Sequence, residues 1–368
     1  MSEPRPTLVP MDVAGRGPRL QARLDAAGCE ALVVTHLTNI RYLTGFTGSA
    51  ATLVVDGAGM LLVTDGRYEE QAADEVAASG APAEVTIGRT VAAQHEIVKH
   101  RLATARVGLE AEQVSWAEQR RFTELLERDV VPTDGLVEAL RAVKDPGEVA
   151  RIEAACTIAD DALATVLPLL DEGPSEAAFA ASLEAEMRRR GADDISFETI
   201  VAAGPNGSRP HHQPGDRRVT RGDLVVVDFG ALVDGYHSDM TRTVAVGGLD
   251  ALDDTQRRMV EVVTAAQAAG VAAVRAGGPV SAVDEACRAV IDEAGWGEAF
   301  VHGTGHGVGL DIHESPGVNG TATATLADGH VITVEPGVYL PGHGGVRVED
   351  TVVVTATGCR TLTCAPKS

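Results

Sequence analysis

The sequence predicts two domains, an α/β N-terminal domain over residues 1–140 and an α+β domain over residues 141–368. Three observations support this division. A chain of 368 residues is longer than one hydrophobic core usually supports. Helix-like and strand-like segments alternate from about residue 18 to residue 128, which is typical of an α/β domain. Beyond residue 145, long helical patterns are mixed with groups of short apolar runs, as in an α+β domain.

The N-terminal elements follow from hydrophobic periodicity and from capping residues. Helices are predicted over 18–28 and 67–78, and strands over 31–35, 51–55 and 60–64. Ser115 followed by Glu118 has the spacing of a capping box, which predicts a helix start. Asp145, Pro146 and Glu148 supply an N-cap, a first-turn proline and a third-position carboxylate, so a long helix is expected from Pro146. The domain boundary is therefore expected at about residue 140.

The C-terminal part carries longer helices and more widely spaced strands. Helices are predicted over 147–167, 175–190, 254–274 and 281–294, and strands over 224–227, 241–246, 331–334, 345–348 and 351–354. No short-period repeat is present, which excludes a solenoid.

Composition excludes several classes of partner. The chain has 44% hydrophobic and 23% charged residues, which is typical of a folded globular protein. Its 53 acidic and 31 basic side chains give a net charge of -22, which repels nucleic acid and anionic membranes alike. Five scattered cysteines without a CxxC pair indicate reduced thiols. No apolar run approaches the roughly 20 residues of a membrane span, and the first ten residues carry none, so we expect a cytoplasmic protein.

Two aspartates are placed where a hairpin would bring them together. Asp228 ends the apolar run Leu224–Val227, and Asp239 follows eleven residues later, beyond the turn-prone pair Asp234-Gly235. An aspartate at a strand end is usually a turn former or a cap, so this pair alone is a weak indication of a site.

A glycine-rich stretch, 302–309, contains His302 and His306, and His313 follows seven residues after His306. The glycines allow close approach of the backbone to a metal or a substrate. A phosphate-binding loop is the competing interpretation, but the stretch has no cationic residue and matches neither GxxxxGK[ST] nor GxGxxG.

Two glutamates also end strand-like runs, Glu335 after 331–334 and Glu349 after 345–348. Either one alone could be a solvated edge residue. Together with Asp228, Asp239 and His306, they predict a dinuclear metal site, because four carboxylates balance two divalent cations and the imidazole adds a neutral ligand. Oxygen-rich ligation favours Mn²⁺ and tolerates Co²⁺, Zn²⁺ or Fe²⁺.

The order and spacing of these motifs resemble the superfamily of pita-bread metallopeptidases that comprises methionine aminopeptidase, prolidase and aminopeptidase P. The motifs that carry the resemblance are 227–230, 236–243, 302–314, 333–337 and 345–350. Residues 38–46 and 64–68 are similar to the creatinase/prolidase N-terminal domain, which methionine aminopeptidases lack. The segment Pro210-His211-His212 is similar to the one that supplies a substrate-binding histidine in the Xaa-Pro branch.

The resemblance implies roles for individual residues. Asp239 and Glu349 would bridge two metals, Asp228 would chelate the second, and His306 with Glu335 would complete the first. A hydroxide activated by both metals would be the nucleophile, and Glu335 would also carry the proton to the leaving proline nitrogen. The remaining candidates act on the substrate or on a ligand: His313, His302 and His211 would donate hydrogen bonds to the substrate carbonyl and the oxyanion, and Arg347 would orient a bridging carboxylate.

The implied activity is removal of an N-terminal residue that precedes proline, with short peptides as substrates and a homodimer as the assembly. An Xaa-Pro aminopeptidase is favoured over an Xaa-Pro dipeptidase, because a dipeptidase needs a cation for the free proline carboxylate. Near the motifs only Arg242 and Arg347 qualify, although Arg41 or Arg67 of the N-terminal domain could serve instead. The alternatives from another class are a metal-free creatinase-like hydrolase and a non-catalytic binding scaffold.

Overall fold

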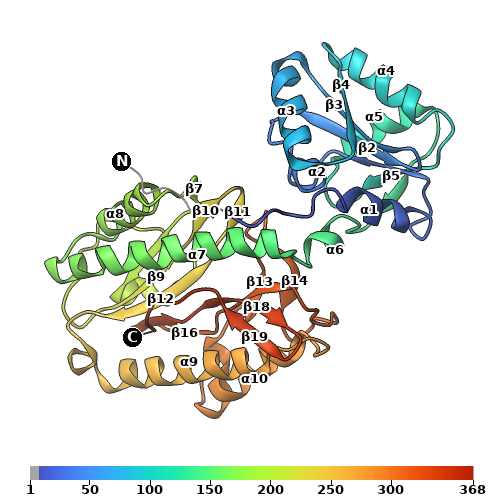
Figure 1. Ribbon diagram of the computed structural model, residues 1–368. Helices are drawn as coiled ribbons and strands as arrows, with labels where there is room; N and C mark the ends of the chain where they lie inside the picture. The colour runs from blue at the N-terminus through green and yellow to red at the C-terminus, as the bar shows by residue number, and fades with distance from the viewer. Residues whose placement is uncertain (1–7, 368) are drawn as a thin grey trace. The chain divides into compact units, whose positions relative to one another are not determined.

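The computed structural model describes residues 8–367, which form two compact units. One unit is Pro10–Arg141, and the other begins at Ala142 and also includes Leu8 and Val9 (Figure 1). The chain therefore passes from one unit to the other between Arg141 and Ala142. Among the residues described, no helix combines the length and apolarity needed to cross a bilayer.

The N-terminal unit is built on one mixed sheet of order β4-β3-β2-β1-β5-β6. Its strands are β1 Ala31–Val34, β2 Ala51–Asp56, β3 Gly59–Thr64, β4 Ala83–Ile87, β5 Val107–Glu110 and β6 Val131–Thr133. Its helices are α1 Arg16–Leu24, α2 Leu37–Thr44, α3 Glu69–Ser79, α4 Val91–Arg101, α5 Trp116–Leu126 and α6 Glu138–Arg141, with a 3₁₀ turn at Gly66–Tyr68. The predicted α/β class is confirmed for this unit.

The sequence prediction for this unit was incomplete, because it named none of α2, α4, α6, β4, β5 and β6. α1 ends at Leu24, four residues early, and the chain turns at Gly28, whose φ of 77° suits glycine. β6 contains Pro132, a residue that is unusual inside a strand. The strand pairs only with β5 at the edge of the sheet, where the missing N–H of proline is tolerated.

The C-terminal unit packs four helices around several small antiparallel sheets. The helices are α7 Pro146–Val166, α8 Glu176–Arg189, α9 Asp254–Ala273 and α10 Ser281–Glu293, with 3₁₀ turns at Leu167–Glu172, Gly204–Ser208, Leu249–Ala251 and Gly297–Ala299. The first strands are β7 Asp194–Ile195, β8 Ile200–Ala203, β9 Leu224–Phe229, β10 Ala231–Val233, β11 Tyr236–His237 and β12 Met240–Ala245. The later strands are β13 Gly305–Gly307, β14 Glu314–Val318, β15 Val331–Val334, β16 Gly337–Leu340, β17 Gly344–Arg347, β18 Asp350–Thr355 and β19 Gly358–Thr361. The sheet orders are β12-β9-β8, β11-β10-β7, β14-β13-β15-β18-β19 and β16-β17.

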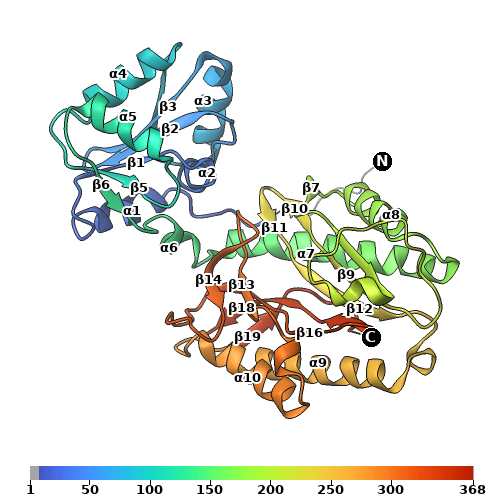
Figure 2. The same cartoon turned by 180° about the vertical axis from the view of Figure 1, so that it is seen from behind.

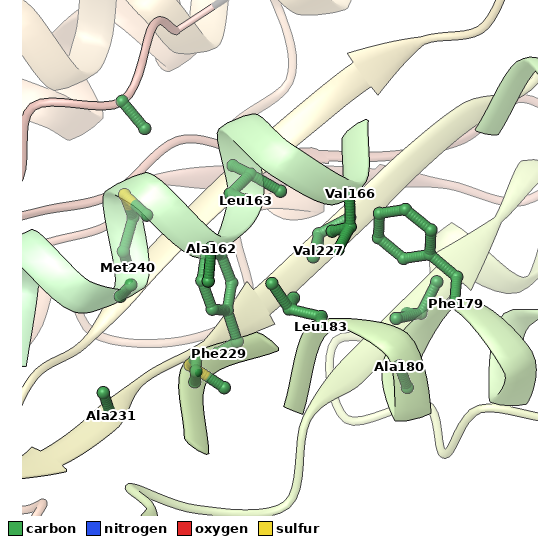
Figure 3. Close-up of a cluster of buried hydrophobic side chains, with 14 of the residues drawn as sticks. Ala162, Leu163, Val166, Phe179, Ala180, Leu183, Val227, Phe229, Ala231 and Met240 are labelled. Atoms are coloured by element: carbon green, nitrogen blue, oxygen red, sulfur yellow. The ribbon is translucent and has the colours of Figure 1, made fainter. Parts of the chain in front are cut away.

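The strands lie between the pair α7 and α8 and the pair α9 and α10 (Figure 2). Two clusters of buried apolar side chains join the strands to these helices. In the first cluster, α7 and α8 pack on β9, β10 and β12, and Leu183, Val227 and Phe229 are fully buried (Figure 3). The second cluster joins α9 and α10 to β15 through β18. Burying one such large side chain contributes about 1.5–3 kcal/mol, so the strands that carry the predicted site are firmly supported from both sides.

The predicted helix starts are confirmed. Asp145 accepts hydrogen bonds from the backbone N–H groups of Gly147 and Glu148, and Glu148 completes the capping box of α7. Ser115 and Glu118 form the same motif at α5. The α+β class predicted for the C-terminal part is likewise confirmed.

Candidate metal and substrate site

All nine predicted site residues line one cavity of about 280 Å³ in the C-terminal unit: His211, Asp228, Asp239, His302, His306, His313, Glu335, Arg347 and Glu349. Apolar side chains, including Phe197, Ile200 and Ile312, complete its wall. Residues separated by more than 130 positions in the sequence thus meet at one point.

The two aspartates are brought together by the β9–β12 pair. Asp228 is opposite Thr241 in this antiparallel ladder, and Asp239 directly precedes β12. Between them, Asp234 and Gly235 have φ values of 49° and 78°, as a tight turn requires, and connect β10 to β11. The hairpin expected from the sequence therefore forms.

His306 lies in the middle of β13, where close packing of the backbone orients its ring. A Cβ atom at Gly305 would lie 2.2 Å from the carbonyl oxygen of Thr333, so only glycine allows this approach. The Nδ1–H group of His306 donates to the carbonyl of Gly307 at 3.0 Å. Its Nε2 atom is left facing the carboxylates of Asp239, at 3.4 Å, and Glu335, at 3.5 Å.

The two glutamates follow strands β15 and β17 and are tied to the same framework. The backbone N–H of Glu335 donates to Thr304 at 2.8 Å, and that of Glu349 donates to Thr241 at 3.1 Å. Glu349 is 1% exposed, and its Oε2 atom accepts from the Thr241 hydroxyl at 2.7 Å.

Burial and the clustering of the acids shift their pKa values. Burial raises the pKa of Asp239 to about 6 and that of Glu335 to about 7, and burial with neighbouring carboxylates raises the pKa of Glu349. Burial lowers the pKa of His306, but the carboxylates of Asp239 and Glu335 outweigh it and raise the pKa to about 9. Such a group of acids favours either protons or cations at its centre.

The donor set fits divalent cations. Ligand atoms of Asp239, His306 and Glu349 lie within 4.8 Å of one another. Asp228 Oδ1 and Glu349 Oε1 are buried and accept no hydrogen bond within the described residues. Buried carboxylate oxygens are normally satisfied, so two unsatisfied ones on residues that line one cavity indicate ligands for a metal.

Arg347 joins a hydrogen-bonded chain that was not predicted. Its guanidinium donates to Asp228 Oδ2 at 2.5 Å, to the Thr241 hydroxyl at 3.1 Å and to the Tyr339 hydroxyl at 2.8 Å. We expected Arg347 to orient a bridging carboxylate; the carboxylate that it contacts directly is Asp228, which we expected to chelate one metal. β17 contacts β9, which brings Arg347 to Asp228, and the Thr241 hydroxyl links Arg347 to Glu349.

His302 has both ring nitrogens engaged in the same chain. Its Nδ1–H donates to the carbonyl of Gly303 at 2.7 Å, so its Nε2 accepts from the Tyr339 hydroxyl at 2.8 Å. Burial lowers the pKa of His302 to about 4, which keeps the ring neutral. His302 therefore has no free donor for a substrate in this arrangement, in contrast to the expected role.

His313 and His211 are exposed at the cavity, as groups that meet a substrate must be. The His313 ring packs edge-on against His306 with 4.3 Å between centroids, and burial together with the His306 ring lowers its pKa. The neighbouring histidines lie elsewhere: His212 bonds Glu176 at 2.9 Å and His237 bonds Ser196 at 2.9 Å.

A second hollow of about 610 Å³ adjoins the first. The two share Phe197, Ile200 and His211 as a common wall, and the second continues along α8 past Ala177 and Ala181. Space for a ligand therefore extends beyond the acidic cluster.

Comparisons with known proteins identify both parts of the chain. Residues 150–356 match the model of metallopeptidase family M24, and residues 16–143 match the Creatinase/Prolidase N-terminal domain. The uncharacterized peptidase YqhT of Bacillus subtilis (strain 168) is 40% identical over 92% of this chain and 95% of its own length.

Two solved structures are also similar to this chain over nearly its whole length. The Xaa-Pro dipeptidase from Bacillus anthracis superposes with a TM-score of 0.91 at 35% identity, covering 97% of this chain and 99% of that one. The X-Pro aminopeptidase from Thermotoga maritima MSB8 has a TM-score of 0.86 at 33% identity, covering 95% and 99%. The pita-bread fold and the creatinase-like N-terminal domain expected from the motifs are thereby confirmed, and the chain belongs to metallopeptidase family M24.

Proposed function

We propose that this chain is a two-metal peptidase that hydrolyses the bond between an N-terminal residue and a following proline. The observation that carries the proposal is the convergence of five ligand-type side chains on one cavity, with two buried carboxylate oxygens lacking hydrogen-bond donors among the described residues. The Xaa-Pro specificity comes from the relatives, since similar chains over nearly the whole length are named as Xaa-Pro dipeptidases and an X-Pro aminopeptidase.

Five residues would hold the cations. We assign Asp239 and Glu349 as bridging ligands, Asp228 as a chelator of the second cation, and His306 with Glu335 as ligands of the first. Mn²⁺ is favoured, because oxygen ligands with one imidazole suit it, and Co²⁺, Zn²⁺ or Fe²⁺ could substitute. When bound, the cations would supply Lewis acidity at the scissile carbonyl and lower the pKa of the attacking water.

The side chains around the cations handle protons and positioning. Glu335, which lines the cavity beside His306, would pass a proton to the leaving proline nitrogen. His313, neutral and exposed beside His306, would donate to the oxyanion, and His211 on the wall shared by the two hollows would bind the substrate backbone. His302 and Tyr339 would fix Arg347, which in turn holds Asp228.

We favour an aminopeptidase over a dipeptidase. The hollow continues past the acidic cluster, which leaves room for residues after proline. Among the residues lining the two hollows, Arg347 is the one arginine or lysine, and it already holds Asp228. A free proline carboxylate would then be left without a partner, which is costly in a buried site.

The test is a peptide panel with metal control. Chelation should abolish cleavage, Mn²⁺ or Co²⁺ should restore it, and Asp239→Ala should not be rescued by either metal. Under saturating Mn²⁺ we expect release of alanine from Ala-Pro-Ala and little turnover of Ala-Ala-Ala. Turnover of Ala-Pro alone would assign the dipeptidase activity instead.

Activity that persists in protein stripped of metal would favour a creatinase-like hydrolase, and absence of any turnover with metals bound would favour a binding scaffold. The homodimer and the cytoplasmic location expected from the sequence stay predictions.

A further inference from the structure

An ion pair is buried directly behind the loop that carries His313. Lys144 Nζ lies 2.9 Å from Glu314 Oε2, and the two side chains are 1% and 5% exposed. Glu314 is the residue next to His313, and Lys144 is separated from it by 170 positions. None of the proposed metal or substrate contacts uses this pair.

The Glu314 carboxylate organises the loop on the cavity side. Its Oε1 atom accepts from the backbone N–H of Asp311 at 3.1 Å. It also lies against Gly309, where a Cβ atom would come within 2.6 Å of Oε2. Residues 309–314 thus fold around this carboxylate, so its position sets where the loop presents His313.

The backbone on both sides of Lys144 is held in place by neighbouring elements. Its backbone N–H donates to the carbonyl of Gly329 at 2.9 Å, and Val143 pairs with His330. The next residue, Asp145, is the N-cap of the 21-residue helix α7. The ammonium group is therefore carried by a segment that is fixed at both its strand-like and its helical side.

Stability alone is a poor reason for such a pair, because the cost of desolvating two charges offsets their attraction. A pair that fixes one geometry is useful where a neighbouring group must be held accurately. We propose that Lys144 is a positioning residue that acts through Glu314 to hold the loop 309–314, and with it His313, against the cavity. The proposal rests on the proposed function, in which His313 donates to the oxyanion.

A double-mutant cycle tests the coupling. The full-length Mn²⁺-loaded protein, Lys144→Met, His313→Ala and the double variant are compared on Ala-Pro-Ala, with bound metal measured for each. We expect Lys144→Met to lower kcat at least tenfold, since a displacement of about 1 Å can cost up to about 10²-fold, with KM changed less than threefold and metal content unchanged. In the His313→Ala background the same substitution should lower kcat less than twofold.

Arg101→Met is the matched control, because it removes a partly buried ion pair to Asp56 in the N-terminal unit and should leave kcat unchanged. Equal losses of kcat from Lys144→Met in both backgrounds, or no loss in the first, would overturn the proposal. If Lys144→Met does not fold, Glu314→Gln is subjected to the same cycle and the same criteria.

Amide hydrogen exchange separates this proposal from the proposed function. The amide of Asp311 should exchange at least tenfold faster in the variant than in the wild type, while the amides of β15 keep their rates. This result is expected even if the wild-type protein does not cleave Ala-Pro-Ala, and unchanged exchange at Asp311 would contradict the proposed positioning.

Discussion

Replacing Glu335 by glutamine should stabilise the metal-free protein at alkaline pH. Burial raises the pKa of this carboxyl from 4.5 to about 7. As pH rises from 4.5 to 7, the unfolded chain loses this proton while the folded protein retains it, so the stability present at low pH is progressively lost. The difference between 4.5 and about 7, at about 1.36 kcal/mol per pH unit, corresponds to about 3 kcal/mol.

The glutamine side chain keeps the shape of the acid and cannot ionise. Glu335→Gln should therefore be more stable than wild type in metal-free solution at pH 8, and its advantage should grow by about 2 kcal/mol between pH 5 and pH 8. The pKa of Asp239 is about 6 and that of His306 is about 9. Stability falls as pH rises through each of these values, in the wild type and in Glu335→Gln alike.

The assay is urea unfolding of chelator-treated protein at pH 5, 6, 7 and 8, with Glu153→Gln at an exposed position of α7 as control. The control should show no growing advantage. Saturating Mn²⁺ should reverse the ranking at pH 8, because the glutamine variant lacks a ligand and wild-type protein is stabilised by binding. An advantage of Glu335→Gln that is constant or shrinks from pH 5 to pH 8 would refute the reasoning.

Three further substitutions probe separate parts of the molecule. His313→Ala should lower kcat by about 10²-fold with metal content nearly intact, and loss of one metal equivalent would show that His313 is a ligand. Tyr339→Phe removes the hydroxyl shared by Arg347 and His302, and should weaken metal binding by about 10-fold, measured by titration with Mn²⁺; unchanged affinity would contradict a supporting role. Asp145→Ala removes the N-cap of α7 and should lower the free energy of unfolding by about 1 kcal/mol in urea, whereas an unchanged midpoint would count against the cap.

The sequence indicated the acidic site because Asp228, Glu335 and Glu349 each follow a run of strand-forming residues that can be recognised locally. The apolar run before Asp228 and the turn pair Asp234-Gly235 together define a hairpin, and the hairpin alone determines that Asp239 returns beside Asp228. Strand β15 was predicted with its observed bounds, since four apolar or β-branched residues before Glu335 have the length and composition of a buried strand. The local sequence was therefore sufficient to predict the hairpin and strand β15.

The supporting groups could not be predicted in the same way. Tyr339 and Thr241 lie inside strands β16 and β12, where tyrosine and threonine are ordinary residues. Their importance depends on contacts that span the fold: Thr241 reaches Glu349 across 108 positions, and Arg347 reaches Asp228 across 119. Only the packing of β17 beside β9 and β12 identifies the partners of Thr241 and Thr243.

In the carboxylates of Asp228 and Glu349, the two oxygens have different surroundings. In each, one oxygen is held by a protein donor, Arg347 for Asp228 and Thr241 for Glu349, while the other oxygen is buried with no hydrogen-bond donor among the described residues. The hydrogen bond to one oxygen restricts the rotation of each carboxylate, so the orientation of its second oxygen is also restricted before any cation binds. Ordering the ligands in advance lowers the entropic cost of binding, and leaving buried acceptors unsatisfied raises the free energy of the metal-free state. Both effects make the free energy of metal binding more favourable. A site built from mutually repelling acids requires such a gain to retain its cations.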